Sequence, residues 1–246
     1  MPESVVAQHN NSSLNVDANN NGITASEELK LKTFKHVTHV IFDLDGLLID
    51  SEQRFAAAIA ILLKRFGINE YSRELQEKVL GMEVARGIEE IIRTTGIPIT
   101  VKEFMVMERE IYMEEMLRVE LMPGAMRLVT HLKKHGIPMA IATGSTMESY
   151  GIKTKRHQDL FKPGLYFNHI VLLVMMKSRF PDKPNPSKII VFEDSSIGVD
   201  GAIAAGMQCV MVPDHRFECK QKKATQILRT LEHFKPELYG LPPFDN

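Results

Sequence analysis

The sequence predicts an α/β fold in which a doubly wound parallel sheet carries an inserted helical domain. Three observations support this prediction. Short apolar runs recur along the chain, segments with helical periodicity lie between most of them, and one long helical stretch interrupts the alternation early. The length of 246 residues suits one large domain, or one domain with a smaller insertion.

Five short runs are predicted to be strands. Each is apolar throughout and bounded by polar or turn residues, as expected for parallel strands that are covered on both faces. In order they are Val37–Phe42, Pro138–Thr143, His169–Leu172, Ile189–Glu193 and Gln208–Val212.

Helical patterns separate these runs. Ala125–His135 is followed by Gly136, and Val199–Ala205 is followed by Gly206. A glycine directly after the last periodic residue is a common end for a helix.

Residues 52–120 show helical periodicity and contain no convincing strand. The apolar spacing predicts helices over Phe55–Phe66, Glu74–Leu80, Gly87–Thr94 and Lys102–Leu117. We therefore expect a helical cap over 52–120, inserted into a core that is formed by 36–51 and 121–246.

Residues 1–35 differ from the rest of the chain. This segment is polar, rich in asparagine and of low complexity. Such a composition buries too little apolar surface to offset the entropy lost on ordering. We expect a disordered tail.

Composition excludes several classes of function. The net charge of −1 and the pI of about 6.8 give no basic excess for binding nucleic acid or an anionic membrane. No apolar run approaches the ~18 residues of a membrane span, and the first residues lack the pattern of a signal peptide. Two cysteines form no disulfide framework, so we expect reduced thiols and a cytoplasmic protein.

The first strand runs directly into Asp43 and Asp45, and Gly46 allows a tight turn after them. Two carboxylates at this spacing suit covalent phosphoryl transfer. One attacks the phosphorus, and the other protonates the leaving oxygen and later activates water. An acidic strand end with a turn glycine is the plain alternative for these residues.

Two further strands end in residues that suit the same site. Thr143 and Gly144 offer a hydroxyl and backbone amides that can cradle a phosphoryl oxygen, although Ser145 or Thr146 could equally be a helix cap. Asp194 follows the fourth strand, and its carboxylate would face Asp43. Hard oxygen ligands that cluster at this edge of a parallel sheet predict a Mg²⁺ ion.

These segments together resemble the haloacid dehalogenase superfamily of phosphatases with a helical cap, and most closely its pseudouridine-5'-phosphatase group. The resemblance runs from about Thr38 to the C-terminus. Its superfamily motifs are Asp43-Leu44-Asp45-Gly46, Thr143-Gly144-Ser145, and Glu193-Asp194-Ser195 with Gly198. The motifs of the narrower group include Leu121–Ala125, Lys133–Pro138, Lys153-Thr154 with Arg156-His157, Gly206–Gln208 and Pro236–Pro242.

The resemblance implies a role for each matching residue. Asp43 would be the nucleophile and a Mg²⁺ ligand, and Asp45 the general acid and base whose backbone carbonyl also binds Mg²⁺. Thr143 would bind the phosphoryl group, and Asp194 would be the remaining carboxylate on the metal, with Glu193 beside it. The helical cap would close over the substrate, so Gly81, Met82 and Arg86 are candidates for selecting it.

One part of the family pattern is missing. The family places a lysine just past the third strand, but here Leu172 runs directly into an apolar segment, and the lysine loop looks deleted. We interpret Lys177 and Lys183 as surface charges rather than replacements.

The shortened link between the third and fourth strands is expected to be tight. About 16 residues must cross about three strand spacings, roughly 14 Å, when a parallel crossover needs a dozen or more. We expect 172–188 to be the most distorted part of the fold.

The resemblance implies a Mg²⁺-dependent phosphomonoesterase that forms an aspartyl phosphate. Its expected partner is a small sugar or nucleotide monophosphate, with pseudouridine 5'-phosphate as the first candidate, and we expect a monomer or weak dimer. Two alternatives stay open. One is a binding or regulatory protein weakened by the missing lysine, and the other is a sugar-phosphate mutase or phosphotransferase.

Overall fold

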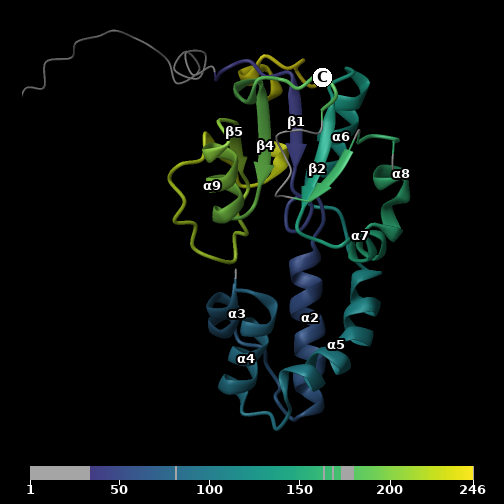
Figure 1. Cartoon of the computed structure of the whole chain (residues 1–246), viewed down its shortest axis with the longest axis vertical. Helices are drawn as coiled ribbons and strands as arrows, with labels where there is room; N and C mark the ends of the chain where they lie inside the picture. Colours follow the sequence, from purple (N-terminus) through teal and green to yellow (C-terminus); the bar gives the residue numbers. More distant parts are fainter. Residues whose placement is uncertain (1–33, 81, 163, 168, 173–179, 246) are drawn as a thin grey trace, which may run out of the picture. The chain divides into compact units, whose positions relative to one another are not determined.

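A six-stranded sheet with strand order β3-β2-β1-β4-β5-β6 forms the core, and every neighbouring pair is parallel (Figure 1). The structure, a computed structural model, describes residues 34–80, 82–162, 164–167, 169–172 and 180–245. The predicted fold class is confirmed. The strands are β1 His39–Phe42, β2 Met139–Thr143, β3 His169–Leu172, β4 Ile189–Glu193, β5 Gln208–Met211 and β6 Gln226–Ile227.

Strand β1 lies between β2 and β4, where it is buried on both faces. Phe42 pairs with Ile141 on one side and with Phe192 on the other. The amide of Asp43 continues this ladder by donating to the carbonyl of Phe192 at 2.9 Å. The residues that follow β1 therefore emerge at the middle of the carboxyl edge of the sheet, where parallel α/β proteins bind ligands.

The two faces of the sheet carry separate apolar layers, because successive strand residues point to opposite sides. Helix α6 (Ala125–Lys134) packs Leu128 and Leu132 against the face that bears Phe42. Helix α9 (Ser196–Ala204) packs Val199 against the face that bears Ile41. Helices on both faces make the sheet doubly wound.

Between β1 and α6 the described chain forms four helices with an apolar core of their own. They are α2 Ser51–Arg65, α3 Arg73–Val79, α4 Val84–Thr95 and α5 Val101–Met116. Leu62, Ile91 and Phe104 are buried at the centre of this group. We call α2 to α5 the cap helices. Since they bury their own apolar residues, their packing depends little on the sheet.

The two segments that join the cap helices to the sheet pair with each other. The amide of Asp50 donates to the carbonyl of Glu120 at 2.9 Å, and the amide of Met122 donates to the carbonyl of Leu48 at 2.9 Å. Entry and exit thus form a two-stranded linker beside the carboxyl edge of β1.

Several predicted boundaries shift because capping side chains extend the helices. Helix α9 begins at Ser196 instead of Val199, because the Ser195 hydroxyl accepts from the amide of Gly198 at 3.0 Å. Helix α2 begins at Ser51 instead of Phe55, with Asp50 as its cap. Strand β1 begins two residues later than predicted, at His39.

Other elements had no clear periodic signal in the sequence. They are helices α7 Met147–Lys153 and α8 Gln158–Phe161, strand β6, and the 3₁₀ turns Lys155–His157, Pro186–Lys188, Leu231–His233 and Pro236–Tyr239. Each spans seven residues or fewer, so an apolar period has little length in which to appear.

Part of the link between β3 and β4 supports the expected distortion. Residues 173–179, including Lys177, lie outside the described residues, as do 1–33 of the predicted tail. Within the described part of the chain, Lys183 is the non-glycine residue with a positive φ, 45°. A left-handed backbone at a lysine is uncommon and marks a tight turn.

Two other sequence-based expectations bear on this fold. No helix in the described ranges is both long and apolar enough to span a membrane. Cys209 is buried, Cys219 is exposed, and neither forms a disulfide.

Candidate active site

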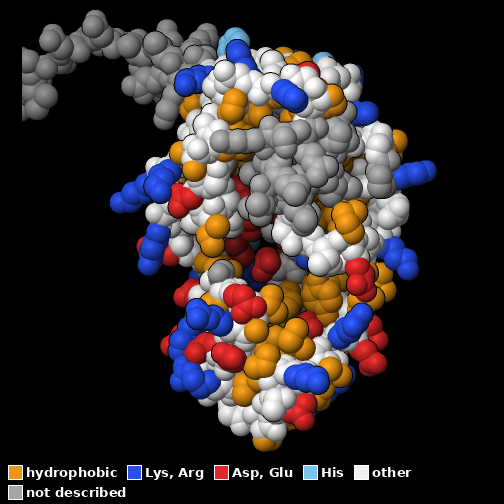
Figure 2. All heavy atoms as spheres, viewed as in Figure 1, with side chains coloured by type: hydrophobic (Ala, Val, Ile, Leu, Met, Phe, Trp, Pro, Cys, Tyr) orange, Lys and Arg blue, Asp and Glu red, His pale blue; other side chains and the backbone are white. Residues whose placement is uncertain are grey.

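The carboxyl ends of β1, β2 and β4 bring the predicted site residues together. Asp43 follows β1, Thr143 ends β2, and Glu193 ends β4, with Asp194 next to it. Because these strands are neighbours in the sheet, their ends share one edge. Figure 2 shows acidic side chains gathered around a hollow between this edge and the cap helices.

Asp43 is buried among other carboxylates. It is 8% exposed, and its Oδ2 atom is buried without a hydrogen-bond partner in the described structure. Burial raises the pKa of Asp43 well above its usual value, and the charges of Glu193, Asp194 and Asp45 raise it further. A cation bound next to this unpaired carboxylate oxygen would offset the repulsion between the neighbouring negative charges.

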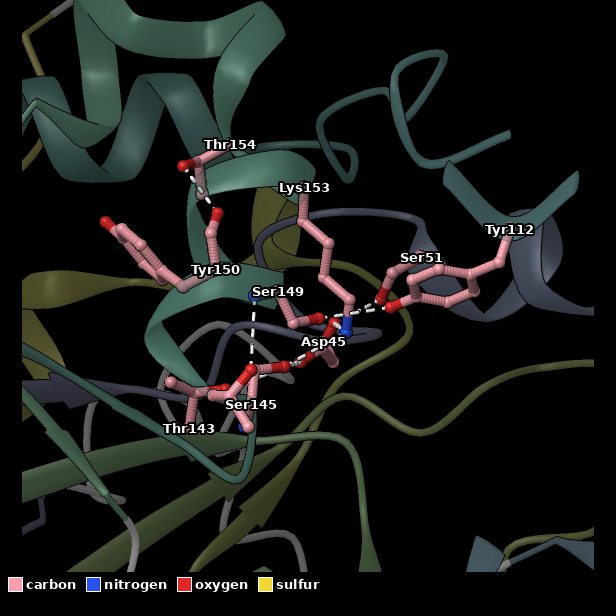
Figure 3. A network of polar contacts seen from close by, with 10 residues as sticks. Asp45, Ser51, Tyr112, Thr143, Ser145, Ser149, Tyr150, Lys153 and Thr154 are labelled. Carbon is pink, nitrogen blue, oxygen red and sulfur yellow. Dashed lines mark hydrogen bonds and ion pairs between the residues drawn. The ribbon is translucent and has the colours of Figure 1, made fainter. Parts of the chain in front are cut away.

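Asp45 is held by donors on both of its oxygens (Figure 3). Oδ1 accepts from the Lys153 ammonium at 2.7 Å and from the Ser51 hydroxyl at 2.6 Å. Oδ2 accepts from the Ser145 hydroxyl at 2.8 Å and from Thr143 at 3.4 Å. Burial alone would raise the pKa of Asp45, but the charge and hydrogen bond of Lys153, with the two serine hydroxyls, lower it below its usual value.

Lys153 was not among the predicted site residues. The sequence offered one signal, its place in the Lys153-Thr154 motif of the group, but nothing in that motif shows where the side chain points. Helix α7 brings it back to the site: Thr146 caps the helix, accepting from the amide of Ser149 at 3.2 Å, and Lys153 lies in the last turn. Its side chain is 11% exposed.

Thr143 and Gly144 lie where they were predicted, at the end of β2. The Thr143 hydroxyl accepts from the amide of Ser145 at 3.0 Å, so the turn after β2 is fixed by its own first residue. A Cβ atom at Gly144 would meet nothing within 4 Å, so its backbone borders open space. That opening leaves room for an oxygen of a ligand.

Glu193 and Asp194 have different surroundings. Glu193 is 3% exposed, and its Oε2 accepts from the amide and the hydroxyl of Ser195, both at 2.9 Å. The Asp194 carboxylate lies against Gly46. Burial, followed by the charges of Glu193 and Glu52, raises the pKa of Asp194.

The residues predicted to select the substrate are only partly described. Gly81 lies outside the described residues. Met82 and Arg86 are exposed near the start of α4. Other cap side chains reach the site instead: Ser51 of α2 contacts Asp45, and Tyr112 of α5 places its hydroxyl 3.1 Å from the Ser149 hydroxyl.

Lys183 lies far from these carboxylates. Its neighbour Asp182 contacts the ring of His39 at 3.1 Å, and His39 is the first residue of β1. The turn that contains Lys183 is therefore at the amino edge of the sheet, opposite to Asp43. Lys183 is exposed in this turn.

A divalent cation fits the donor set, although the side chains do not yet converge on one point. In the described part of the chain, no three His, Cys, Asp or Glu side chains form a ready-made metal site. The unpaired Oδ2 of Asp43 and the raised pKa values of Asp43 and Asp194 show that negative charge is concentrated here without compensation. Hard oxygen donors of this kind suit Mg²⁺.

Comparison with known proteins gives a consistent result. Residues 40–212 match the family described as haloacid dehalogenase-like hydrolase. The chain is 36% identical over 230 residues to the probable pseudouridine-5'-phosphatase of Drosophila melanogaster, a match that covers 87% of this chain and 98% of that protein. It is 38% identical over 230 residues to (DL)-glycerol-3-phosphatase 2 of Arabidopsis thaliana, covering 85% and 94% respectively.

A solved structure shares the fold. It is a HAD family hydrolase from Deinococcus radiodurans R1 with bound phosphate and sodium. The TM-score is 0.68, and the match covers 84% of this chain and 98% of that one. At 20% sequence identity the similarity concerns the fold alone.

Proposed function

The chain belongs to the haloacid dehalogenase-like hydrolase family, and we propose that it is a Mg²⁺-dependent phosphomonoesterase that acts through an aspartyl phosphate on Asp43. One observation carries the proposal: Asp43 presents an unpaired buried oxygen within a cluster of carboxylates at the carboxyl edge of β1. The relatives that bear phosphatase names support the reaction class.

Asp43 and Asp45 divide the chemistry. An Oδ atom of Asp43 attacks the phosphorus, and the bond from phosphorus to the ester oxygen breaks. The leaving oxygen takes a proton from Asp45. Asp45 then accepts a proton from water, and that water attacks the phosphorus, which releases phosphate and restores Asp43.

Asp43, Asp194 and the backbone carbonyl of Asp45 would hold the Mg²⁺ ion. When bound, the cation supplies the positive charge that keeps Asp43 ionised and offsets the charge of the phosphate. Thr143 and the backbone at Gly144 would contact the phosphoryl oxygens. Glu193 would restrain the segment that carries Asp194, because its carboxylate accepts two hydrogen bonds from Ser195.

The substrate is proposed to be a small phosphorylated metabolite. Pseudouridine 5'-phosphate and glycerol 3-phosphate are the first candidates, because relatives named for phosphatases of these compounds cover most of this chain. Met82 and Arg86, exposed at the start of α4, remain the proposed selecting residues.

The test is phosphate release by the purified full chain with Mg²⁺. The panel contains pseudouridine 5'-phosphate, glycerol 3-phosphate, a flavin mononucleotide and a hexose phosphate. We expect turnover of at least one ester, its loss with EDTA, and its loss in Asp43→Asn. Asp159→Asn is the matched control, because Asp159 is exposed on α8.

The same assay separates the alternatives. Transfer of phosphate to an added sugar, without release to water, would identify a phosphotransferase. Binding of an ester without any turnover, detected by calorimetry, would identify a binding or regulatory protein. Either result would refute the phosphatase proposal.

We also propose a cytoplasmic location, because the unpaired thiols of Cys209 and Cys219 fit a reducing compartment. Fractionation of cells that express the chain would test this, and recovery in a secretory fraction would contradict it.

A further inference from the structure

Lys153 lies among residues from different parts of the fold. Its ammonium donates to Asp45 at 2.7 Å and to the Ser145 hydroxyl at 3.0 Å. The hydroxyl of Tyr112, on cap helix α5, lies close enough to contribute to raising the pKa of Lys153.

The Tyr112 side chain lies against the face of α7 that bears Lys153. Ser149 and Lys153 are four residues apart on α7, which places their side chains on one face of the helix. The Tyr112 hydroxyl lies 3.1 Å from the Ser149 hydroxyl, on the side of the site where the Lys153 ammonium lies (Figure 3). A residue of the cap therefore contacts the helix that carries the ammonium.

The residues that follow α7 contact the linker that leads from cap helix α5 back to the core. The ring of His157 contacts the carbonyl of Val119 at 2.8 Å, and Arg156 pairs with Glu120 at 2.7 Å. One short stretch of chain, from Lys153 to His157, thus contacts both Asp45 and the linker between α5 and α6.

We propose that Lys153 is a positioning residue for Asp45, and that Tyr112 couples it to the cap, so that Asp45 is correctly placed only when α5 is seated against α7. This inference rests on the proposed function, in which Asp45 is the general acid and base. Proton transfer requires Asp45 to be within hydrogen-bond reach of the leaving oxygen, and a misplacement of about 1 Å can cost ~10²-fold in rate.

Without the ammonium, Asp45 would lose its charged partner. Ser51 and Ser145 would remain as neutral donors, while the negative charges of Asp43 and Asp194 would still lie nearby. The carboxylate would then occupy several positions rather than one. The effect should appear in turnover rather than in substrate binding.

The experiment compares kcat and KM of four single variants of the full chain with Mg²⁺. Lys153→Met should lower kcat by about 10²-fold and leave KM within about threefold. Lys153→Arg should recover part of the loss, because it restores the charge. Tyr112→Phe should lower kcat by about threefold to tenfold. Lys155→Met, which removes an exposed lysine two residues away, should match the wild type.

The double variant tests the coupling. If Tyr112 acts through Lys153, the variant with both Lys153→Met and Tyr112→Phe should be no slower than Lys153→Met alone. A wild-type kcat in Lys153→Met, or two effects that multiply independently, would overturn the inference while the phosphatase activity stood.

If the wild type released no phosphate, the proposed function would fail and a second readout would decide the inference. Urea unfolding of the same single and double variants should show non-additive changes in stability for Lys153 with Tyr112, and for Lys153 with Asp45→Asn. Additive changes for both pairs would overturn the contacts on which the inference depends.

Discussion

The carboxylate of Asp194 occupies the space that a side chain at Gly46 would need. Gly46 also has a φ of 83°, in the left-handed region. The turn after β1 is therefore shaped by both a backbone and a packing requirement, and glycine meets both. This contact brings the residue after β4 against the turn after β1.

We expect Gly46→Ala to lower the free energy of unfolding by about 2–4 kcal/mol, because it adds the strain of a left-handed alanine to a clash with Asp194. Gly67→Ala is the control, since Gly67 has a φ of 78° and open space around it. That variant should lose only about 1 kcal/mol. Equal losses by urea unfolding would show that Asp194 does not press on residue 46.

Gly198→Ala is expected to lower the free energy of unfolding by about 1–3 kcal/mol, because its methyl group would overlap the buried Glu193 carboxylate. Gly201→Ala on the same helix meets nothing within 4 Å and should gain about 0.5–1 kcal/mol. Urea unfolding of the pair measures the difference. If both variants were stabilised equally, the Glu193 carboxylate would not lie against residue 198.

Asp43→Asn is expected to stabilise the metal-free protein at pH 7 and above. The pKa of Asp43 is raised in the folded state, so the stability of the wild type is complete at low pH and falls as the pH rises above 3.8, the usual pKa. Asparagine does not ionise, so the variant does not lose stability in this way. Its advantage in stability over the wild type should therefore vanish below about pH 4. Thermal melting across pH measures it, with Asp159→Asn as the unaffected control.

Mg²⁺ should reverse the order of thermal stability of the wild type and the Asp43→Asn variant. The cation would bind the wild type through Asp43 and Asp194 and raise its melting temperature, by mass action. The Asp43→Asn variant should respond much less. The same rise in both would argue that Asp43 is not a ligand.

Glu108 on α5 should make stability fall between about pH 4.5 and 7. Its Oε1 is buried without a hydrogen-bond partner in the described structure, and burial raises the pKa to about 7. Because the folded pKa exceeds the usual 4.5, stability is complete below pH 4.5 and is lost as the pH rises to 7.

Glu108→Gln should therefore be more stable than the wild type at pH 8 by about 1–3 kcal/mol, and equal to it at pH 4. Glu110→Gln, at an exposed position on the same helix, is the control. Urea unfolding at both pH values decides the matter, and a gain that is independent of pH would contradict the explanation.

Much of the fold could be predicted from local patterns. The central strands are continuous apolar runs, and α6 shows a clear helical period, so their place in a parallel sheet followed from the sequence. Helix α7 could not be predicted in the same way. Its seven residues show no clear apolar period, and its cap Thr146 was one of two equal candidates.

The site was predicted in part for a related reason. Asp43, Thr143 and Asp194 follow strands, and parallel strands that are neighbours share an edge, so their proximity follows from topology alone. Lys153 reaches the same edge from the end of a helix. Its long side chain can take many directions, and only the packing of α7 and α5 selects one of them.

The sequence by itself therefore determined the sheet, the order of the carboxylates along it and the family of the protein, because these depend on periodicity and strand ends. Tertiary structure alone decided which positively charged side chain contacts Asp45. The contact joins residues 108 positions apart in the sequence, and no local pattern encodes a distance of 2.7 Å between them.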